Sequence, residues 1–160
     1  MTNPLIKQNS SQSGCDCSAL RQAARYLTAA YDQVLAESGL RLTQFSILYK
    51  LATCGPQTIT DLSAAMAMDR TTLGRNLRLL GEGGLIRLRS GADRRERLAD
   101  LTATGRRKLD AAYPLWQKAQ EQFESRFGRE NAEKLRKTLR SVLDTGLDPW
   151  GHERHGEMQD

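Results

Sequence analysis

Residues 84–105, GLIRLRSGADRRERLADLTATG, constrain the fold of this chain more than any other stretch. Apolar and polar residues alternate over most of 85–89 and less strictly over 97–101, and a period of two is typical of a half-buried β-strand. The short polar tip SGADRRE can join two antiparallel strands, and Thr102 then supplies a helix start signal. The stretch therefore predicts a two-stranded ribbon that leads directly into a helix.

The chain before the ribbon is expected to be helical, because its apolar residues recur at helical spacing. A first helix is predicted to end at Gly39, and Thr43 is expected to cap a second helix that stops at the Gly55-Pro56 break. A third, short helix over 58–67 is expected to turn these side chains inward: Ile59, Leu62, Ala65 and Met66.

Asp69 is well placed to cap a fourth helix, which Gly83-Gly84 would end. Its buried stripe is expected to be Leu73, Leu77 and Leu80. After the ribbon, a long helix from Thr102 to about Phe127 and a last helix over 129–145 are predicted on either side of Gly128.

The distribution of charge points to a polyanionic partner. The net charge is +5, and residues 69–109 alone hold eleven Lys and Arg against five Asp and Glu. Such a concentration of positive charge is expected for a protein that binds nucleic acid. No apolar run approaches the roughly 18 residues of a membrane span, and the polar start lacks the apolar core of a signal peptide, so a cytoplasmic protein with no membrane contact is predicted.

Two short helices followed by a ribbon is the order of a winged helix-turn-helix, so we predict a mainly α fold with a small β-wing. The helix after Asp69 would lie in the major groove of double-stranded DNA and present the side chains opposite its buried stripe: Arg70, Thr71, Thr72, Arg75, Asn76 and Arg78. Arg75 is expected to read a base edge from the middle of this face, and Arg70 and Arg78 to contact phosphates.

The ribbon would be the wing, with its cations following the DNA backbone and its tip entering the minor groove. Asp93 is expected to hold a tip arginine in place through a charge-assisted hydrogen bond. The predicted wing residues are Arg87, Arg89, Asp93, Arg94, Arg95 and Arg97.

DRTTLGRNLRLLGEGGLIRLRSGADRRERLADLTATG resembles the recognition helix and wing of the MarR family of bacterial transcriptional regulators, including a D-R-R tip followed by L-T and a helix. The resemblance covers about residues 18–145 and implies a repressor-type homodimer, held by the first helix and the last two, on a pseudo-palindromic operator. The terminal helices carry apolar stripes for which one chain offers little cover: Leu109, Tyr113, Trp116, Leu135, Leu139 and Val142.

This interpretation divides the chain into five parts. They are a flexible arm at 1–17, dimerisation and support helices at 18–55, a winged helix-turn-helix unit at 56–103, C-terminal dimerisation helices at 104–146 and a flexible tail at 147–160.

The cysteines suggest one way of sensing a signal. CSALRQAARYLTAAYDQ resembles the first helix of the organic-hydroperoxide-sensing (OhrR) branch of the family, in which a cysteine is oxidised to release DNA. This resemblance makes Cys17 the redox candidate, with Cys15 nearby, and places Tyr31 where that branch has a tyrosine that bonds the partner chain's cysteine. Leu42 stands where a second tyrosine is usual. Cys54 is expected to be a small buried residue.

The alternative signal is a small aromatic effector, which the resemblance places in a pocket between the dimerisation helices and the winged unit. The candidate lining residues are Tyr26, Tyr31, Phe45 and Tyr49.

Other functional classes have weaker support. No catalytic residue, cofactor or metal site is predicted, because His152 and His155 both lie in the tail and no phosphate-binding glycine loop occurs. The remaining rivals are a thiol enzyme at Cys15 and Cys17 and a winged helix that binds protein. The arginine-rich face argues against the second, because protein interfaces favour aromatic and apolar anchors.

Overall fold

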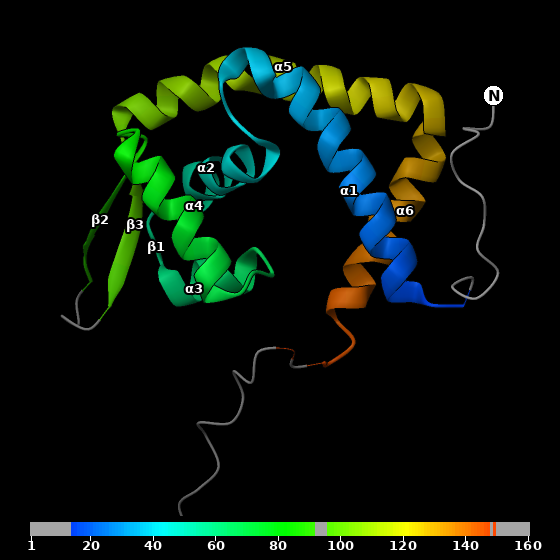
Figure 1. Cartoon of the computed structure of the whole chain (residues 1–160), viewed down its shortest axis with the longest axis horizontal. Coiled ribbons are helices and arrows are strands. Elements are labelled where there is room, and N and C mark those ends of the chain that lie inside the picture. Colours follow the sequence, from blue (N-terminus) through cyan, green and yellow to red (C-terminus); the bar gives the residue numbers. More distant parts are fainter. Residues whose placement is uncertain (1–13, 92–95, 148, 150–160) are drawn as a thin grey trace, which may run out of the picture.

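The computed structural model describes residues 14–91, 96–147 and 149, and the predicted helical patterns and ribbon are all present (Figure 1). The elements follow one another as α1 (Asp16–Leu35), the short 3-10 helix η1 (Ala36–Ser38), α2 (Leu42–Cys54), β1 (Gln57–Thr58), α3 (Ile59–Ala65), α4 (Arg70–Glu82), β2 (Ile86–Ser90), β3 (Arg97–Leu101), α5 (Ala103–Phe127) and α6 (Arg129–Leu143). None of these helices is long and apolar enough to cross a membrane.

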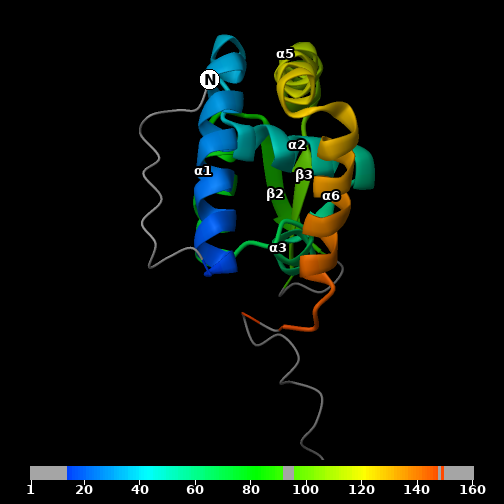
Figure 2. The same cartoon turned by 90° about the vertical axis from the view of Figure 1, so that its right-hand side faces the viewer.

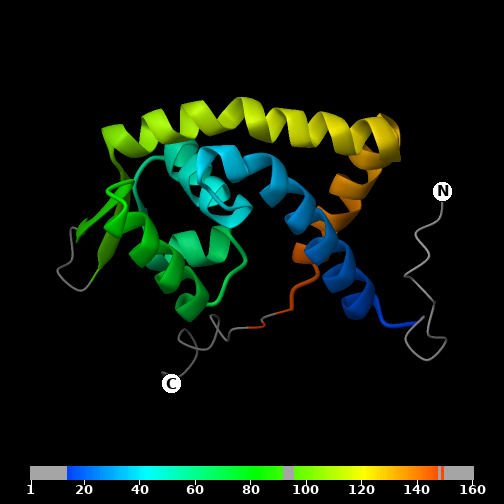
Figure 3. The same ribbon diagram turned by 45° about the horizontal axis from the view of Figure 1, so that its top comes forward.

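The 25-residue helix α5 spans the molecule and joins its two ends. Helices α2, α3 and α4 and the sheet gather beneath its N-terminal part (Figure 1). At the other end α1 and α6 descend from α5 on separate sides (Figure 2). Figure 3 shows α1 running from the junction of α2 and α5 out to its own N-terminus, away from the sheet. The molecule therefore has a mixed α/β end and an all-helical end.

The sheet contains one strand, β1, that was not predicted from the sequence. The three strands lie in the order β1-β3-β2, and each pairs with its neighbour in antiparallel fashion. Gln57 of β1 pairs with Ala99 of β3. In the ribbon Leu88 lies opposite Ala99 and Arg87 lies opposite Asp100. Because successive side chains alternate between faces, Ala99 points into the core and Asp100 points away from it.

The core lies where α2, α3, α4 and the ribbon meet the N-terminal half of α5. The leucine stripe of α4 is buried as predicted, with Leu73, Leu77 and Leu80 each at most 1% exposed. They pack in one cluster with buried residues of α2, α3, the strands and α5: Phe45, Ile47, Leu48, Leu51, Leu62, Ile86, Ala99, Leu109 and Ala112.

Two local predictions are wrong. Thr43 does not cap α2, which begins at Leu42. The first free N–H, that of Leu42, donates instead to the Asp32 carboxylate of α1 over 2.7 Å. In α3, Ala65 is exposed and Ser63 is buried in its place, with its hydroxyl donating to the Met68 carbonyl oxygen. The polar side chain is tolerated there because its hydroxyl is satisfied.

The apolar stripe at the start of α5 is covered within the chain, contrary to prediction. Leu109 is buried. The rings of Tyr113 and Trp116 pack against two rings of α2, those of Phe45 and Tyr49. The centroids of adjacent rings in this group of four are 5.6–6.3 Å apart. In α6, by contrast, Leu139 and Val142 remain 38% and 42% exposed. Of these two stripes, the one on α6 therefore remains exposed.

The wing is joined to α5 by close backbone packing. The Thr102 hydroxyl donates to the Gly84 carbonyl oxygen over 2.7 Å and accepts from the Gly105 N–H over 2.9 Å, so one side chain ties the end of the α4–β2 turn to the start of α5. Gly105 itself is buried, and a methyl group on its Cα would overlap the Leu85 carbonyl oxygen and the Leu101 side chain.

We expect Gly105→Ala to lower the free energy of unfolding by about 1–3 kcal/mol or more, because α5 must move away from the wing root. Gly74→Ala is the matched control: Gly74 is interior to α4, and a methyl there meets nothing within 4 Å. That variant should gain roughly 0.5–1 kcal/mol. Urea unfolding followed by circular dichroism measures both, and equal stability of the two variants would refute the close-packed joint.

Candidate nucleic-acid interface

The N-terminus of α4 is fixed by a short turn and a side-chain cap. The Asp69 carboxylate accepts the Thr72 N–H over 2.8 Å, as predicted for an N-cap. The turn that precedes it includes Ala67 with a φ of 47°, a left-handed conformation that a residue other than glycine rarely adopts. Helices α3 and α4 are also linked across the turn, because Arg70 donates to the Thr60 hydroxyl over 3.3 Å.

The solvent side of α4 carries the predicted cations, although not all six residues lie on it equally. Thr71, Arg75 and Arg78 are exposed opposite the leucine stripe, and Arg78 pairs with Glu82 over 2.9 Å. Arg75 has no ion-pair or side-chain hydrogen-bond partner among the residues that the structure describes. Asn76 is only half exposed, and its amide donates to the Thr72 carbonyl oxygen over 2.9 Å. Among the described residues, Arg75 is thus the cation of α4 that has neither an ion pair nor a side-chain hydrogen bond.

The wing arginines divide between the two faces of the ribbon. Arg87 and Arg89 share the outer face with Asp100, and its Oδ2 accepts from Arg87 Nη2 at 2.8 Å and lies 3.4 Å from Arg89 Nε. Arg97 is paired with Ser90, so it lies on the face of Leu88 and Ala99 instead. The predicted tip residues Asp93, Arg94 and Arg95 lie outside the described residues.

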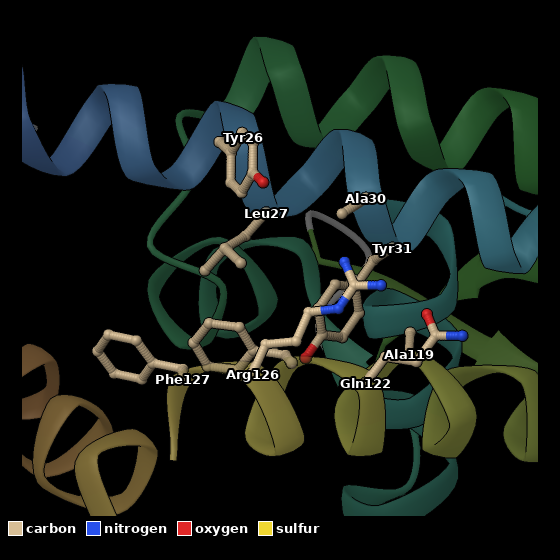
Figure 4. A pocket seen from close by; sticks show the side chains of 9 residues that line it. Tyr26, Leu27, Ala30, Tyr31, Ala119, Gln122, Arg126 and Phe127 are labelled. Atoms are coloured by element: carbon tan, nitrogen blue, oxygen red, sulfur yellow. The ribbon is translucent and has the colours of Figure 1, made fainter. Parts of the chain in front are cut away.

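The effector candidates do not share one pocket. Tyr26 and Tyr31 line a hollow of about 240 Å³ between α1 and the C-terminal half of α5 (Figure 4). Phe45 is instead 3% exposed in the core, and Tyr49 borders a second hollow of about 280 Å³ between α2 and the start of α5. The first hollow is mainly apolar with one cation at its edge; its lining includes Tyr26, Leu27, Tyr31, Phe123, Arg126 and Phe127.

A polar relay runs from the wall of the first hollow through α5 to α6. The Tyr31 hydroxyl donates to Gln120 over 2.7 Å, Gln120 donates to Glu124 over 2.8 Å, and Glu124 accepts from Arg136 of α6 over 3.0 Å. Hydrogen bonds from Gln120 and Arg136 hold the pKa of Glu124 below its ordinary value. Burial, with the charge of Glu124 nearby, raises the pKa of Tyr31. Tyr31 is therefore a neutral hydrogen-bond donor, and its hydroxyl already donates to Gln120 of the same chain.

The cysteines are all accessible thiols. Cys15 is the residue before α1 and Cys17 lies in the first turn of α1, and both are exposed, as the sensing hypothesis requires. Cys54 is also exposed, at the last position of α2, so the expectation of a buried residue is wrong. The described residues contain no group of three or more metal-binding side chains.

The relay and the Arg87–Asp100–Arg89 group are features that sequence reasoning missed. The relay joins residues of three helices, and nothing in the local sequence signals such contacts. The pairing of Arg87 with Asp100 follows from the register of the ribbon. The alternating pattern of the two strands, together with an assumed length for the tip, could have predicted that register from the sequence.

The cap of α4 has a predictable pH dependence. Hydrogen bonds from the side chain and N–H of Thr72 hold the pKa of Asp69 below its ordinary value. A lowered pKa in the folded state stabilises the protein above the unfolded-state pKa, and this stabilisation disappears as the pH falls through the folded-state pKa.

We therefore expect Asp69→Ala to lower the melting temperature at pH 7, and the difference from the wild type to shrink as the pH falls from about 5 to about 2. Asp69→Asn keeps an acceptor without the charge, so it should melt above Asp69→Ala with little change in their difference across the acid range. Thermal melts at closely spaced pH values test this, and a difference between wild type and Asp69→Ala that stays constant down to pH 2 would contradict it.

Comparison with known proteins agrees with this geometry. The model of the MarR family matches residues 40–96, from the start of α2 to the end of the wing tip. The M. tuberculosis transcriptional regulator MosR, solved in complex with DNA, is 38% identical, and the match covers 81% of this chain and 94% of MosR with a TM-score of 0.74. Bordetella bronchiseptica BpsR is 25% identical over 78% of this chain and 96% of its own, with a TM-score of 0.70.

The Bacillus subtilis protein YwoH, named an uncharacterized HTH-type transcriptional regulator, is 29% identical over 124 residues, which are 78% of this chain and 90% of YwoH. The likeness to MosR and YwoH extends over 94% and 90% of their respective lengths. With a winged helix-turn-helix whose second helix presents arginine to solvent, the chain is a member of the MarR family of transcriptional regulators.

Proposed function

We propose that two copies of this chain form a repressor that binds a pseudo-palindromic DNA operator, with α4 in the major groove and the wing beside it. The exposed face of α4 carries the proposal, because Arg75 lies in its middle with no partner among the described residues. Arginine there can donate to guanine or to a phosphate, and the arginines of β2 and β3 extend the positive surface sideways. The DNA complex of the 38% identical MosR supports the same use of this fold.

The all-helical end supports a homodimer. Large apolar side chains are exposed on α1, at the end of α5 and on α6: Leu20, Tyr26, Phe127, Leu139, Val142 and Leu143. Tyr26 and Leu143 are 67% and 70% exposed, and large apolar side chains this exposed favour a second surface that covers them. Two-fold symmetry of the dimer would place the two α4 helices on half-sites about one helical turn of DNA apart.

The proposal is tested by selecting bound sequences from random duplex DNA with the purified protein and measuring affinity by fluorescence anisotropy. Sedimentation in the same buffer gives the number of chains per duplex. We expect a selected site with two inverted half-sites and two chains bound. Equal affinity for the selected site and for a scrambled duplex of the same composition would refute sequence-specific binding.

Arg75→Ala should remove a base contact and cost about 1–3 kcal/mol of binding free energy. The loss should be confined to one position per half-site, so affinity for operators changed at that position should fall much less than for the intact operator. Arg78→Ala is the matched control on the same face, and its loss should be similar for every operator variant. Uniform weakening by Arg75→Ala would assign Arg75 to the DNA backbone instead.

Release from DNA is proposed to follow occupation of the hollow between α1 and α5 by a small aromatic molecule. The mainly apolar lining and the Arg126 guanidinium suit a ring with an acidic substituent. BpsR offers a parallel, since its DNA binding is regulated by 6-hydroxynicotinic acid. The second candidate is oxidation of Cys17, which is favoured by its exposure and by its position in the first turn of α1, two residues after the exposed Cys15.

In the oxidation scheme an organic hydroperoxide takes the electron pair of the Cys17 thiolate, which gives a sulfenic acid and an alcohol. Cys15 or a cysteine of the second copy then forms a disulfide and releases water. We expect stoichiometric hydroperoxide to lower the operator affinity of the wild type and to leave Cys17→Ser unaffected, with Cys54→Ser as the matched control that behaves like the wild type. If wild type and Cys17→Ser respond equally, the aromatic effector remains as the signal.

A further inference from the structure

Leu79 is an apolar side chain on the surface of a helix whose other exposed positions are polar or glycine. It is 49% exposed, whereas Leu77 and Leu80 on either side of it are each 1% exposed. Leu79 is therefore not part of the hydrophobic core. Its neighbours three and four positions away are Arg75, Asn76, Glu82 and Gly83, so α4 itself places no second exposed apolar side chain beside it.

Its direction places Leu79 with the side chains proposed to meet DNA. At 3.6 residues per turn, Leu79 lies about 40° around the helix from Arg75 and about 20° from Thr72. The three form one stripe along the exposed side of α4, and Leu79 lies one turn beyond Arg75. If Arg75 reaches a base edge, Leu79 faces the floor of the same groove one step further along.

The major groove offers one apolar group to such a side chain, the 5-methyl group of thymine. We propose that Leu79 is a specificity-determining residue that selects thymine by packing against this methyl group, next to the base pair that Arg75 reads. This inference rests on the proposed function, because it requires α4 to lie in the major groove. It adds an apolar contact to an interface otherwise built from hydrogen bonds and charge.

The test removes only the methyl group. Each thymine of the selected operator is replaced in turn by deoxyuridine, and affinity is measured for the wild type, Leu79→Ala, Leu79→Met and Leu88→Ala. Leu88 is an exposed leucine of the wing and serves as the matched control. Leu79→Ala should fold normally, because an exposed helical leucine is replaced by the residue of highest helix propensity.

We expect the wild type to lose about threefold to fivefold in affinity at one thymine per half-site, which corresponds to the burial of about one methyl group. Leu79→Ala should bind the thymine and uracil duplexes equally at that position, while Leu79→Met and Leu88→Ala keep the loss. A wild type that tolerates uracil everywhere, or a Leu79→Ala variant with the same loss, would overturn the assignment to Leu79 and leave operator binding intact. Failure of the wild type to select any sequence would instead remove the proposed function itself.

Discussion

Burial of the leucine stripe of α4 is the constraint on which the interface depends. Leu73, Leu77 and Leu80 are excluded from solvent, and each contributes roughly 1.5–3 kcal/mol through that burial. Turning the helix by a single residue, about 100°, would expose part of this stripe, so the helix has one stable rotation. The burial of this stripe therefore directs the opposite face of α4 to solvent, and that orientation does not depend on contacts made by the exposed side chains. Arg75 on this face can remain without a partner among the described residues because the other side of the helix holds α4 in place.

Patterns confined to one element were predictable from the sequence, and contacts between elements were not. The Asp69 cap, the α4 stripe and the β3 bounds follow from capping chemistry and periodicity. The two residues of β1 are too few to show a period, and the N-terminus of α2 is satisfied by a carboxylate ten residues earlier in the chain, on α1. Tyr113 and Trp116 looked uncovered because their partners, the rings of α2, become neighbours only when α5 folds back over that helix.

The site was predicted in the same uneven way. The solvent-facing side of α4 could be predicted from the sequence, because it lies opposite the leucine stripe. The division of the wing arginines between two faces required the register of the ribbon, and the separation of Tyr31 from Phe45 required the packing of α1 on α5. In α5, the wing joint at Gly105 and the relay residues Gln120 and Glu124 lie on one continuous helix. The helix α5 therefore connects the winged end of the molecule directly to its all-helical end.

The Asp100 carboxylate changes what the arginines of the wing contribute to binding a polyanion. The two strands contain Arg87, Arg89 and Arg97, but Asp100 already neutralises part of the charge of the first two. When these side chains meet phosphates, fewer condensed counterions are displaced than three isolated cations would release. Each phosphate neutralised contributes roughly 0.9 to the slope of log affinity against log salt concentration. The ribbon should therefore make binding less sensitive to ionic strength than its number of arginines implies, and more dependent on the fit between its fixed guanidinium groups and the shape of the backbone.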